Sequence, residues 1–376
     1  MKIVYALEST GLYGGTKVIL RQAEALTHRG HEVTVVSPEP FPAWFEGTVD
    51  FSQASLRDAG PFRQAHWVIG SYFRHIPSLF SDRMIARKLW HLSQGYEGGW
   101  PEAAPDLPEI EKVYRFPIPK MTVSPQLSKS LGKQFPGRYY SVGQGIETQY
   151  FYPREKMVTW AVEDKLRVFL VGTFPASVKN IATGLTAVWK ARNRLGSRLQ
   201  LVRITTQNTR DAEERLYGPI DNYYVHLAPR KMGELFRSGG ILLSPYRKGE
   251  GFGLPPMEAM ACGIPTVITG IPSFLNFAEP ADYSIFVSPE DPDQMADAIC
   301  FLAGHPDEAK RLAHRGIEVA SRYSFKKVAG NIERTLRMEY IRRLCPKWLH
   351  ALYRNLGMKR KIIYAKCLKF EVPKVS

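Results

Sequence analysis

Cysteine is scarce in this chain of 376 residues, and its spacing excludes two kinds of stabilising site. The four cysteines, Cys262, Cys300, Cys345 and Cys367, lie far apart in the sequence. They form neither a disulfide framework nor the paired spacing of a zinc site. We therefore expect a protein of a reducing cytoplasm, in which Cys262 is a small buried side chain.

Long apolar runs are also missing. No stretch of about 18 apolar residues occurs, which argues against a membrane-spanning helix. Residues 1–7 are apolar but run into Glu8, so this segment is too short for a signal peptide and is predicted to be a first β-strand. A hydrophobic content of 44% is enough for filled cores, and the length suits two domains of ordinary size.

Basic residues outnumber acidic ones, and the excess is concentrated at the C-terminal end of the sequence. The net charge is +15, and residues 341–376 hold ten Lys or Arg against the single acid Glu371. Trp348, Tyr353 and several apolar residues are mixed with these cations. The tail is predicted to bind an anionic membrane surface, which would place a cytoplasmic protein peripherally on the inner face of the membrane. A solvated tail or a partner contact is the alternative, and nucleic acid is not expected.

Strand and helix patterns alternate along the chain, which predicts an α/β fold with parallel sheets. Two such series are separated by a polar stretch at residues 154–164. The predicted strands are residues 2–7, 32–37, 66–70, 88–92, 120–123, 166–172, 199–204, 240–245, 266–268 and 284–287. The predicted helices are residues 16–29, 181–195 and 255–262, with several more between 292 and 343.

Two glutamates around a glycine-rich turn are the most informative feature. Glu250 and Glu258 bracket the sequence Gly-Phe-Gly-Leu-Pro-Pro-Met, where a glycine turn leads from a predicted buried strand into a short helix. A glycine turn before a helix exposes unpaired backbone N–H groups, and phosphate is the usual ligand of such groups. Carboxylates beside the turn can hold sugar hydroxyls. The segment therefore predicts a nucleotide-sugar site.

This segment resembles the Glu-x7-Glu signature of the retaining glycosyltransferases of family four, which have the GT-B fold. The resemblance implies two doubly wound Rossmann-like domains that face a central cleft, with a C-terminal helix crossing back to the first domain. It is strong at residues 240–272 and weak between 40 and 115. The implied parts are an acceptor-side domain at 1–155, a nucleotide-sugar domain at 156–325, a crossover helix at 326–345 and a basic aromatic tail at 346–376.

The resemblance also implies which residues bind the donor. Glu258 would accept hydrogen bonds from ribose hydroxyls, Glu250 would hold the sugar near its reacting carbon, and Lys179 would stabilise the leaving diphosphate. A surface lysine is the alternative for Lys179. The donor-binding set is Gly14, Gly15, Gly172, Thr173, Lys179, Glu250, Gly251, Phe252, Gly253, Leu254 and Glu258.

Two positions depart from the family pattern or match it loosely. Thr173 stands where the family often has an arginine, and Arg247 or Lys248 is the candidate replacement for that second positive charge. His91 is the best match to a family histidine that contacts the donor sugar, although a core histidine is the alternative. The expected catalytic residues are thus Glu250, Lys179 and His91.

Residues 144–147 resemble a family segment at the domain junction, with a plain hairpin turn as the alternative. Asp291 and Asp293 are spaced like the metal motif of the GT-A fold. Because Pro292 lies between them and an amphipathic helix follows, Asp291 is instead predicted to be a helix N-cap. We expect no metal site and no cofactor.

The predicted activity is that of a retaining, metal-independent hexosyl- or related glycosyltransferase. Its co-substrate would be a nucleoside diphosphate sugar, with UDP as the default and GDP or dTDP as alternatives. Its acceptor would be a hydroxyl of a cell-surface glycan, a glycolipid or a lipid-linked precursor, as in polysaccharide biosynthesis. The competing hypotheses are a GT-B enzyme of another type, such as a nucleotide-sugar epimerase or a phosphorylase, and a non-catalytic protein that binds glycan or membrane.

Overall fold

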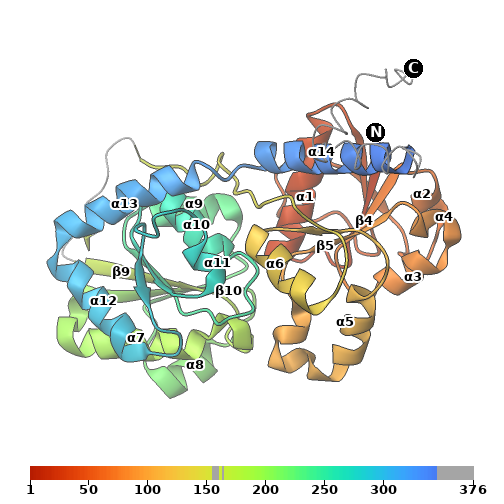
Figure 1. Ribbon diagram of the computed structural model, residues 1–376. Coiled ribbons are helices and arrows are strands. Elements are labelled where there is room, and N and C mark those ends of the chain that lie inside the picture. Colours follow the sequence, from red (N-terminus) through yellow and green to blue (C-terminus); the bar gives the residue numbers. More distant parts are fainter. Residues whose placement is uncertain (155–160, 163–164, 345–376) are drawn as a thin grey trace.

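The computed structural model describes residues 1–154, 161–162 and 165–344, which form two Rossmann-like α/β domains (Figure 1). Each domain has a mostly parallel sheet covered by helices on both faces. The alternating strand and helix patterns of the sequence therefore predicted the fold class correctly. The basic aromatic tail predicted at 346–376 lies outside the described residues.

The N-terminal sheet has seven parallel strands in the order β3-β2-β1-β4-β5-β6-β7. Its central strands are mostly apolar because helices bury both faces of the sheet. The strand order reverses beside β1, which opens a crevice at the carboxyl end of that strand. The strands are β1 (Lys2–Ala6), β2 (Glu32–Ser37), β3 (Asp50–Gln53), β4 (Trp67–Gly70), β5 (Leu89–Ser93), β6 (Lys120–Thr122) and β7 (Tyr139–Ser141).

The helices of this domain include several short ones between residues 40 and 115, where the resemblance to the family is weak. They are α1 (Gly14–Thr27), α2 (Gly60–Arg63), α3 (Ile76–Ser81), α4 (Arg83–Ala86), α5 (Leu107–Tyr114) and α6 (Pro125–Gln134), with the 3-10 helices η1 (Glu97–Gly99) and η2 (Pro101–Asp106). The sequence did not predict strands β3 and β7, which are short and lie at the two edges of the sheet.

The C-terminal sheet has six parallel strands in the order β11-β10-β9-β12-β13-β14, and β8 pairs antiparallel with β9. Here the strand order reverses beside β9. The strands are β8 (Ala161–Val162), β9 (Lys165–Val171), β10 (Leu199–Thr205), β11 (Asn222–Val225), β12 (Ile241–Ser244), β13 (Thr266–Thr269) and β14 (Ile285–Val287). The helices are η3 (Ser177–Lys179), α7 (Ile181–Leu195), η4 (Gly196–Arg198), α8 (Arg210–Tyr217), α9 (Pro229–Arg237), α10 (Leu254–Ala261), α11 (Pro272–Leu275), α12 (Pro292–Gly304) and α13 (Pro306–Ala320).

The last described helix, α14 (Phe325–Leu344), returns to the N-terminal domain and lies against α1 (Figure 1). Its apolar side chains Val328, Ile332 and Leu336 belong to the same core cluster as strands β1 and β2. Glu339 on α14 also accepts two hydrogen bonds from Arg138, at 2.9 and 3.0 Å. The predicted crossover of the C-terminal helix is confirmed.

Candidate active site

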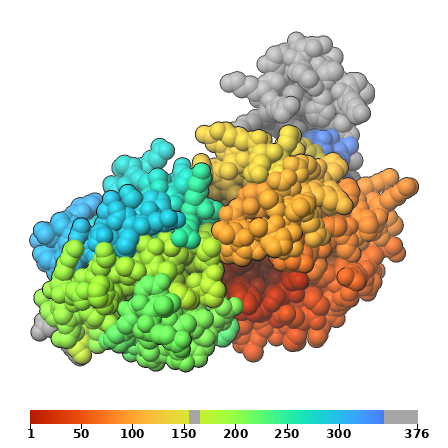
Figure 2. Space-filling view, turned by 90° about the horizontal axis from the view of Figure 1, so that it is seen from below, coloured from red at the N-terminus to blue at the C-terminus, as the bar shows by residue number. Residues whose placement is uncertain are grey.

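A cavity of about 760 Å³ lies between the two domains. It is lined by the loops that follow β1 and β5 in the N-terminal domain and β9, β10 and β12 in the C-terminal domain. The carboxyl ends of both sheets therefore face each other across the cavity, the position at which open α/β sheets bind ligands. Figure 2 shows the hollow between the red N-terminal residues and the green C-terminal domain.

The glycine turn before α10 forms one wall of this cavity. Gly253 has φ +83°, and a Cβ there would lie 2.3 Å from Phe274 Cε1, so only glycine fits the turn. A Cβ on Gly251 would lie 1.8 Å from the backbone oxygen of Gln94 in the opposite domain. Gly253 thus shapes the turn, and Gly251 allows the two domains to meet. The N-terminus of α10, with the positive end of the helix dipole, faces the cavity.

Lys179 and Glu250 form an ion pair at the C-terminal side of the cavity. Lys179 Nζ donates to Glu250 Oε2 at 2.6 Å and lies 4.2 Å from the centroid of the Tyr246 ring. Burial alone would lower the pKa of Lys179, but the charge of Glu250 and the nearby Tyr246 outweigh it and raise that pKa above its ordinary value. The lysine is therefore a fixed cation at neutral pH.

Glu258 lies at the back of the cavity and is 1% exposed. Lys17 of α1, in the opposite domain, makes a very short ion pair with Glu258 Oε1 and lies 3.4 Å from Glu147 Oε2. The other oxygen of Glu147 accepts a hydrogen bond from Arg21 Nε at 2.7 Å. Burial raises the pKa of the Glu258 carboxyl, Lys17 opposes this shift, and Glu147 adds to it.

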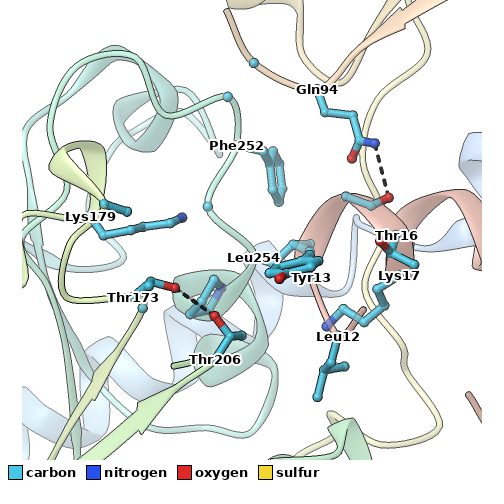
Figure 3. Close-up of a pocket in the computed structure, with 18 of the residues that line it drawn as sticks. Leu12, Tyr13, Thr16, Lys17, Gln94, Thr173, Lys179, Thr206, Phe252 and Leu254 are labelled. Atoms are coloured by element: carbon cyan, nitrogen blue, oxygen red, sulfur yellow. Dashed lines mark hydrogen bonds between the residues drawn. The ribbon is translucent and has the colours of Figure 1, made fainter. Parts of the chain in front are cut away.

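The loop after β1 and the loop after β5 form the N-terminal wall. Gly14 and Gly15 begin α1, and the side chain of Gln94 donates from Nε2 to the Gly15 carbonyl at 3.2 Å (Figure 3). A Cβ on Gly14 would lie 3.4 Å from Leu254 of α10, so the two glycine turns face each other. The structure thus brings the predicted glycines of both domains to one cavity.

Thr173 lines the cavity at the position where the sequence lacks the expected arginine. Its Oγ1 lies 2.8 Å from Thr206 Oγ1 (Figure 3). Arg247 does not line the cavity, since it pairs with Glu290 at 2.7 Å. Among the described residues that line the cavity, the lysines are Lys17 and Lys179, and no arginine is present.

His91 is not brought to the cavity, which corrects its predicted role. It is the middle residue of β5, is 0% exposed, and its ring lies 4.9 Å from the ring of Tyr114. Burial, together with the charge of Lys120, lowers the pKa of His91 to about 3. The residue that reaches the cavity from this strand is Gln94, one residue beyond its end.

Sequence reasoning missed Lys17 and Arg21, and it placed Glu147 in a segment at the domain junction, with a plain hairpin turn as the alternative, without giving it a role of its own. A signal was present, because Lys17 and Arg21 are four residues apart on the predicted helix 16–29 and so share one face. Both are buried in the structure, at 8% and 3% exposure. Two cations on one helix face require carboxylate partners if that face is buried.

A metal-binding cluster and a membrane-spanning helix are both absent from the described part of the chain. There, no group of three or more His, Cys, Asp or Glu side chains is arranged to hold a metal ion. No described helix is long and apolar enough to cross a membrane.

Comparison with known proteins shows which solved structures share this fold. Sucrose-phosphate synthase from Thermosynechococcus elongatus matches with a TM-score of 0.70 and 14% identity, over 90% of this chain and 99% of that structure. HepE of Anabaena, in complex with UDP-glucose, also matches with a TM-score of 0.70 and 14% identity, over 89% of this chain and 99% of that structure. These likenesses establish the GT-B fold.

The sequence matches are confined to part of the chain. Residues 165–305, which hold the turn and both signature glutamates, match the family of glycosyl transferases group 1. The MMP alpha-(1->4)-mannosyltransferase of Mycolicibacterium hassiacum is 27% identical over 218 residues, which cover 55% of this chain and 51% of that protein. The chain thus spans about half the length of this curated relative. Its C-terminal domain is similar to those of glycosyl transferases group 1.

Proposed function

We propose that this protein is a retaining glycosyltransferase of the Glu-x7-Glu group that moves a sugar from a nucleoside diphosphate sugar to a hydroxyl acceptor. The observation that carries this proposal is the convergence of Glu250, Glu258, Lys179 and the N-terminus of α10 on one interdomain cavity. Carboxylates for hydroxyls, a cation for phosphate and a helix N-terminus are the groups that nucleotide-sugar recognition requires. The match of residues 165–305 to glycosyl transferases group 1 supports the same reaction class.

The arrangement suggests a role for each of these groups. Glu258 accepts hydrogen bonds from the ribose, deep in the cavity. Glu250, with the backbone N–H groups of Phe252, Gly253 and Leu254, holds sugar hydroxyls beside the reacting carbon. Lys179, fixed by Glu250, neutralises the diphosphate as negative charge grows on it in the transition state.

Retention of configuration is proposed to occur by attack on the front face of the sugar. The bond between the anomeric carbon and the phosphate oxygen breaks, and the bond to the acceptor oxygen forms on the same face. The acceptor proton goes to the leaving phosphate, so neither a catalytic base nor a metal is required. This assignment fits Glu250, whose carboxylate is already engaged by Lys179.

The donor sugar is proposed to be mannose or glucose. One relative is a mannosyltransferase by name, and HepE, with the same fold, is described in complex with UDP-glucose. UDP remains the default nucleotide, with GDP and dTDP as alternatives. The acceptor is proposed to be a glycan, a glycolipid or a lipid-linked precursor on the Gly14 side of the cavity, in a protein that works in the cytoplasm or on the inner face of the membrane.

A panel of UDP-glucose, GDP-mannose and dTDP-glucose, tested by thermal shift and by calorimetry without added metal, identifies the donor. Glu250→Ala should then lower kcat/KM for transfer to a hydroxyl acceptor by about a hundredfold or more, because a transition-state contact is lost. Glu318→Ala is the control, since Glu318 is an exposed residue of α13 that pairs with Arg315. Full activity of Glu250→Ala would overturn the site assignment.

A further inference from the structure

Lys17 occupies an unusual position at the seam between the domains. It comes from α1 of the N-terminal domain but makes its closest contact with Glu258 of α10, in the C-terminal domain. Its side chain is 10% exposed, and those of Glu147 and Glu258 are 0% and 2% exposed. All three groups are therefore largely shielded from water, although Lys17 and Glu258 also line the cavity.

Lys17 is the cation that contacts both Glu147 and Glu258. Glu147 and Glu258 interact unfavourably, since Glu147 contributes to raising the pKa of Glu258. Arg21 also contacts Glu147, but it is shared with Glu24 at 2.7 Å and does not contact Glu258. Two buried carboxylates without Lys17 would place uncompensated negative charge beside the site proposed for an anionic diphosphate.

We propose that Lys17 is a positioning residue for the donor, which holds the Glu258 carboxylate aimed into the cavity from the opposite domain. Lys17 occupies Oε1 of Glu258, which leaves the second oxygen to accept a hydrogen bond from a ribose hydroxyl. Because the two residues belong to different domains, Glu258 is fully oriented only when the domains are closed. This inference rests on the proposed function, since it assumes that Glu258 binds the donor.

A role that is only structural makes a different prediction from a positioning role. If Lys17 merely joined the domains, removing its charge and then that of Glu147 would delete successive ion pairs, and donor binding would weaken at each step. If Lys17 balances two carboxylates, removing the charge of Glu147 from a variant that lacks Lys17 relieves repulsion at Glu258. Donor binding should then partly recover.

The test compares Lys17→Met with the double variant Lys17→Met/Glu147→Gln. The ligand is UDP-glucose or GDP-mannose, whichever the wild-type protein binds more tightly, and Kd is measured by calorimetry. We expect Lys17→Met to raise Kd by about tenfold or more, with KM for the donor rising more than kcat falls. The double variant should recover at least about threefold of that loss. Lys190→Met is the matched control, because Lys190 pairs with Asp293 at 2.6 Å on the exposed surface of the same molecule.

The outcomes separate this inference from the proposed function. If the wild-type protein binds no nucleotide sugar, the proposed function itself fails. If the wild-type protein binds a donor and Lys17→Met binds it equally well, the positioning role is wrong. A further rise of Kd in the double variant would also overturn it and would leave Lys17 as a structural link. Thermal unfolding of each variant identifies any that fails to fold, in which case Glu147→Gln alone is tested. The positioning role expects that variant to bind the donor with an unchanged or lower Kd, and a higher Kd would overturn it.

Discussion

Two lysines, one from each domain, supply the positive side-chain charge of the cavity within the described residues. Each is paired with one of the two signature glutamates, Lys179 with Glu250 and Lys17 with Glu258. A paired lysine is held in one orientation, so less side-chain entropy is lost when a ligand binds. Each pair also keeps a carboxylate and a cation side by side, which suits the proposed donor with its hydroxyls and phosphates.

A prediction at this scale concerns His91, which is buried and neutral. Its pKa is about 3 in the folded protein against an ordinary 6.5, so below pH 6.5 the unfolded chain takes up a proton that the folded protein does not. The contribution of the neutral His91 ring to the free energy of unfolding is fully present above pH 6.5 and is lost as the pH falls toward 3. Near the middle of that range the unfolded chain is almost fully protonated at this residue and the folded protein is not, so the loss there approaches about 1.4 kcal/mol per pH unit.

His91→Leu should remove this contribution, so its free energy of unfolding should depend less steeply on pH between 6.5 and about 4.5 than that of the wild type. Urea titrations at several pH values measure this. Transfer activity should be retained, because the residue lies outside the cavity. His28→Leu, at an exposed position just after α1, is the control. Equal pH dependence in wild type and His91→Leu, or a loss of catalysis with the fold intact, would contradict this account of His91.

At the scale of elements, the N-termini of two helices differ in what their backbone N–H groups face. The start of α10 has no side-chain cap, and its N-terminus faces the cavity. The start of α12 is capped, since Asp291 Oδ1 accepts from the backbone N–H of Gln294 at 2.9 Å and Pro292 takes the first helical position. The predicted N-cap is confirmed, and the spacing that resembles a metal motif has a local structural cause.

Asp291→Ala should therefore lower the free energy of unfolding by about 1 kcal/mol, the usual cost of losing an N-cap. Asp293→Ala should cost less, since Asp293 makes an exposed ion pair with Lys190. Urea denaturation measures both, and transfer rates with and without EDTA should not differ for either variant. A loss of activity in Asp291→Ala that added Mn²⁺ restores would support the metal reading of this motif instead.

At the scale of the whole molecule, the two domains meet closely around the cavity. Glu46 of the N-terminal domain pairs with Arg230 of α9 at 2.6 Å, and Ser177 donates its backbone N–H to Glu102 at 3.3 Å. Gly251 lies directly against the backbone at Gln94. Contacts of this kind depend on domain closure, which would exclude water from the reacting centre in the proposed transfer reaction.

Gly251→Ala tests the importance of this approach, because the added methyl would lie 1.8 Å from the Gln94 carbonyl oxygen and keep the domains apart. We expect kcat/KM for the donor to fall by about tenfold or more, with little change in thermal stability. Small-angle scattering with donor should give a larger radius of gyration than for the wild type. Gly304→Ala, at a site where a Cβ meets nothing within 4 Å, is the control. Wild-type kinetics in Gly251→Ala would mean that the cavity works without this contact.

The parts of the site that the sequence predicted are those that one continuous segment builds. Gly251, Gly253 and Glu258 lie within a single turn and helix, so their spacing already fixes where they stand relative to one another. The prediction failed at His91, because a strand covered on both faces gives no periodic signal of which side a residue takes. It also missed Lys17, whose partner Glu258 is 241 positions away in the chain.

The sequence by itself therefore determined the alternation of strands and helices, the glycine turn with its two glutamates and the cap of α12, since each depends on neighbours within a few residues. Only the tertiary structure decided that β5 presents Gln94 rather than His91 to the cavity, and that Lys17 and Glu147 meet Glu258 at the seam. The first outcome depends on how β5 packs within its own sheet, and the second depends on how the two sheets face each other. Contacts between distant segments follow from packing and burial of charge, which local sequence patterns do not encode.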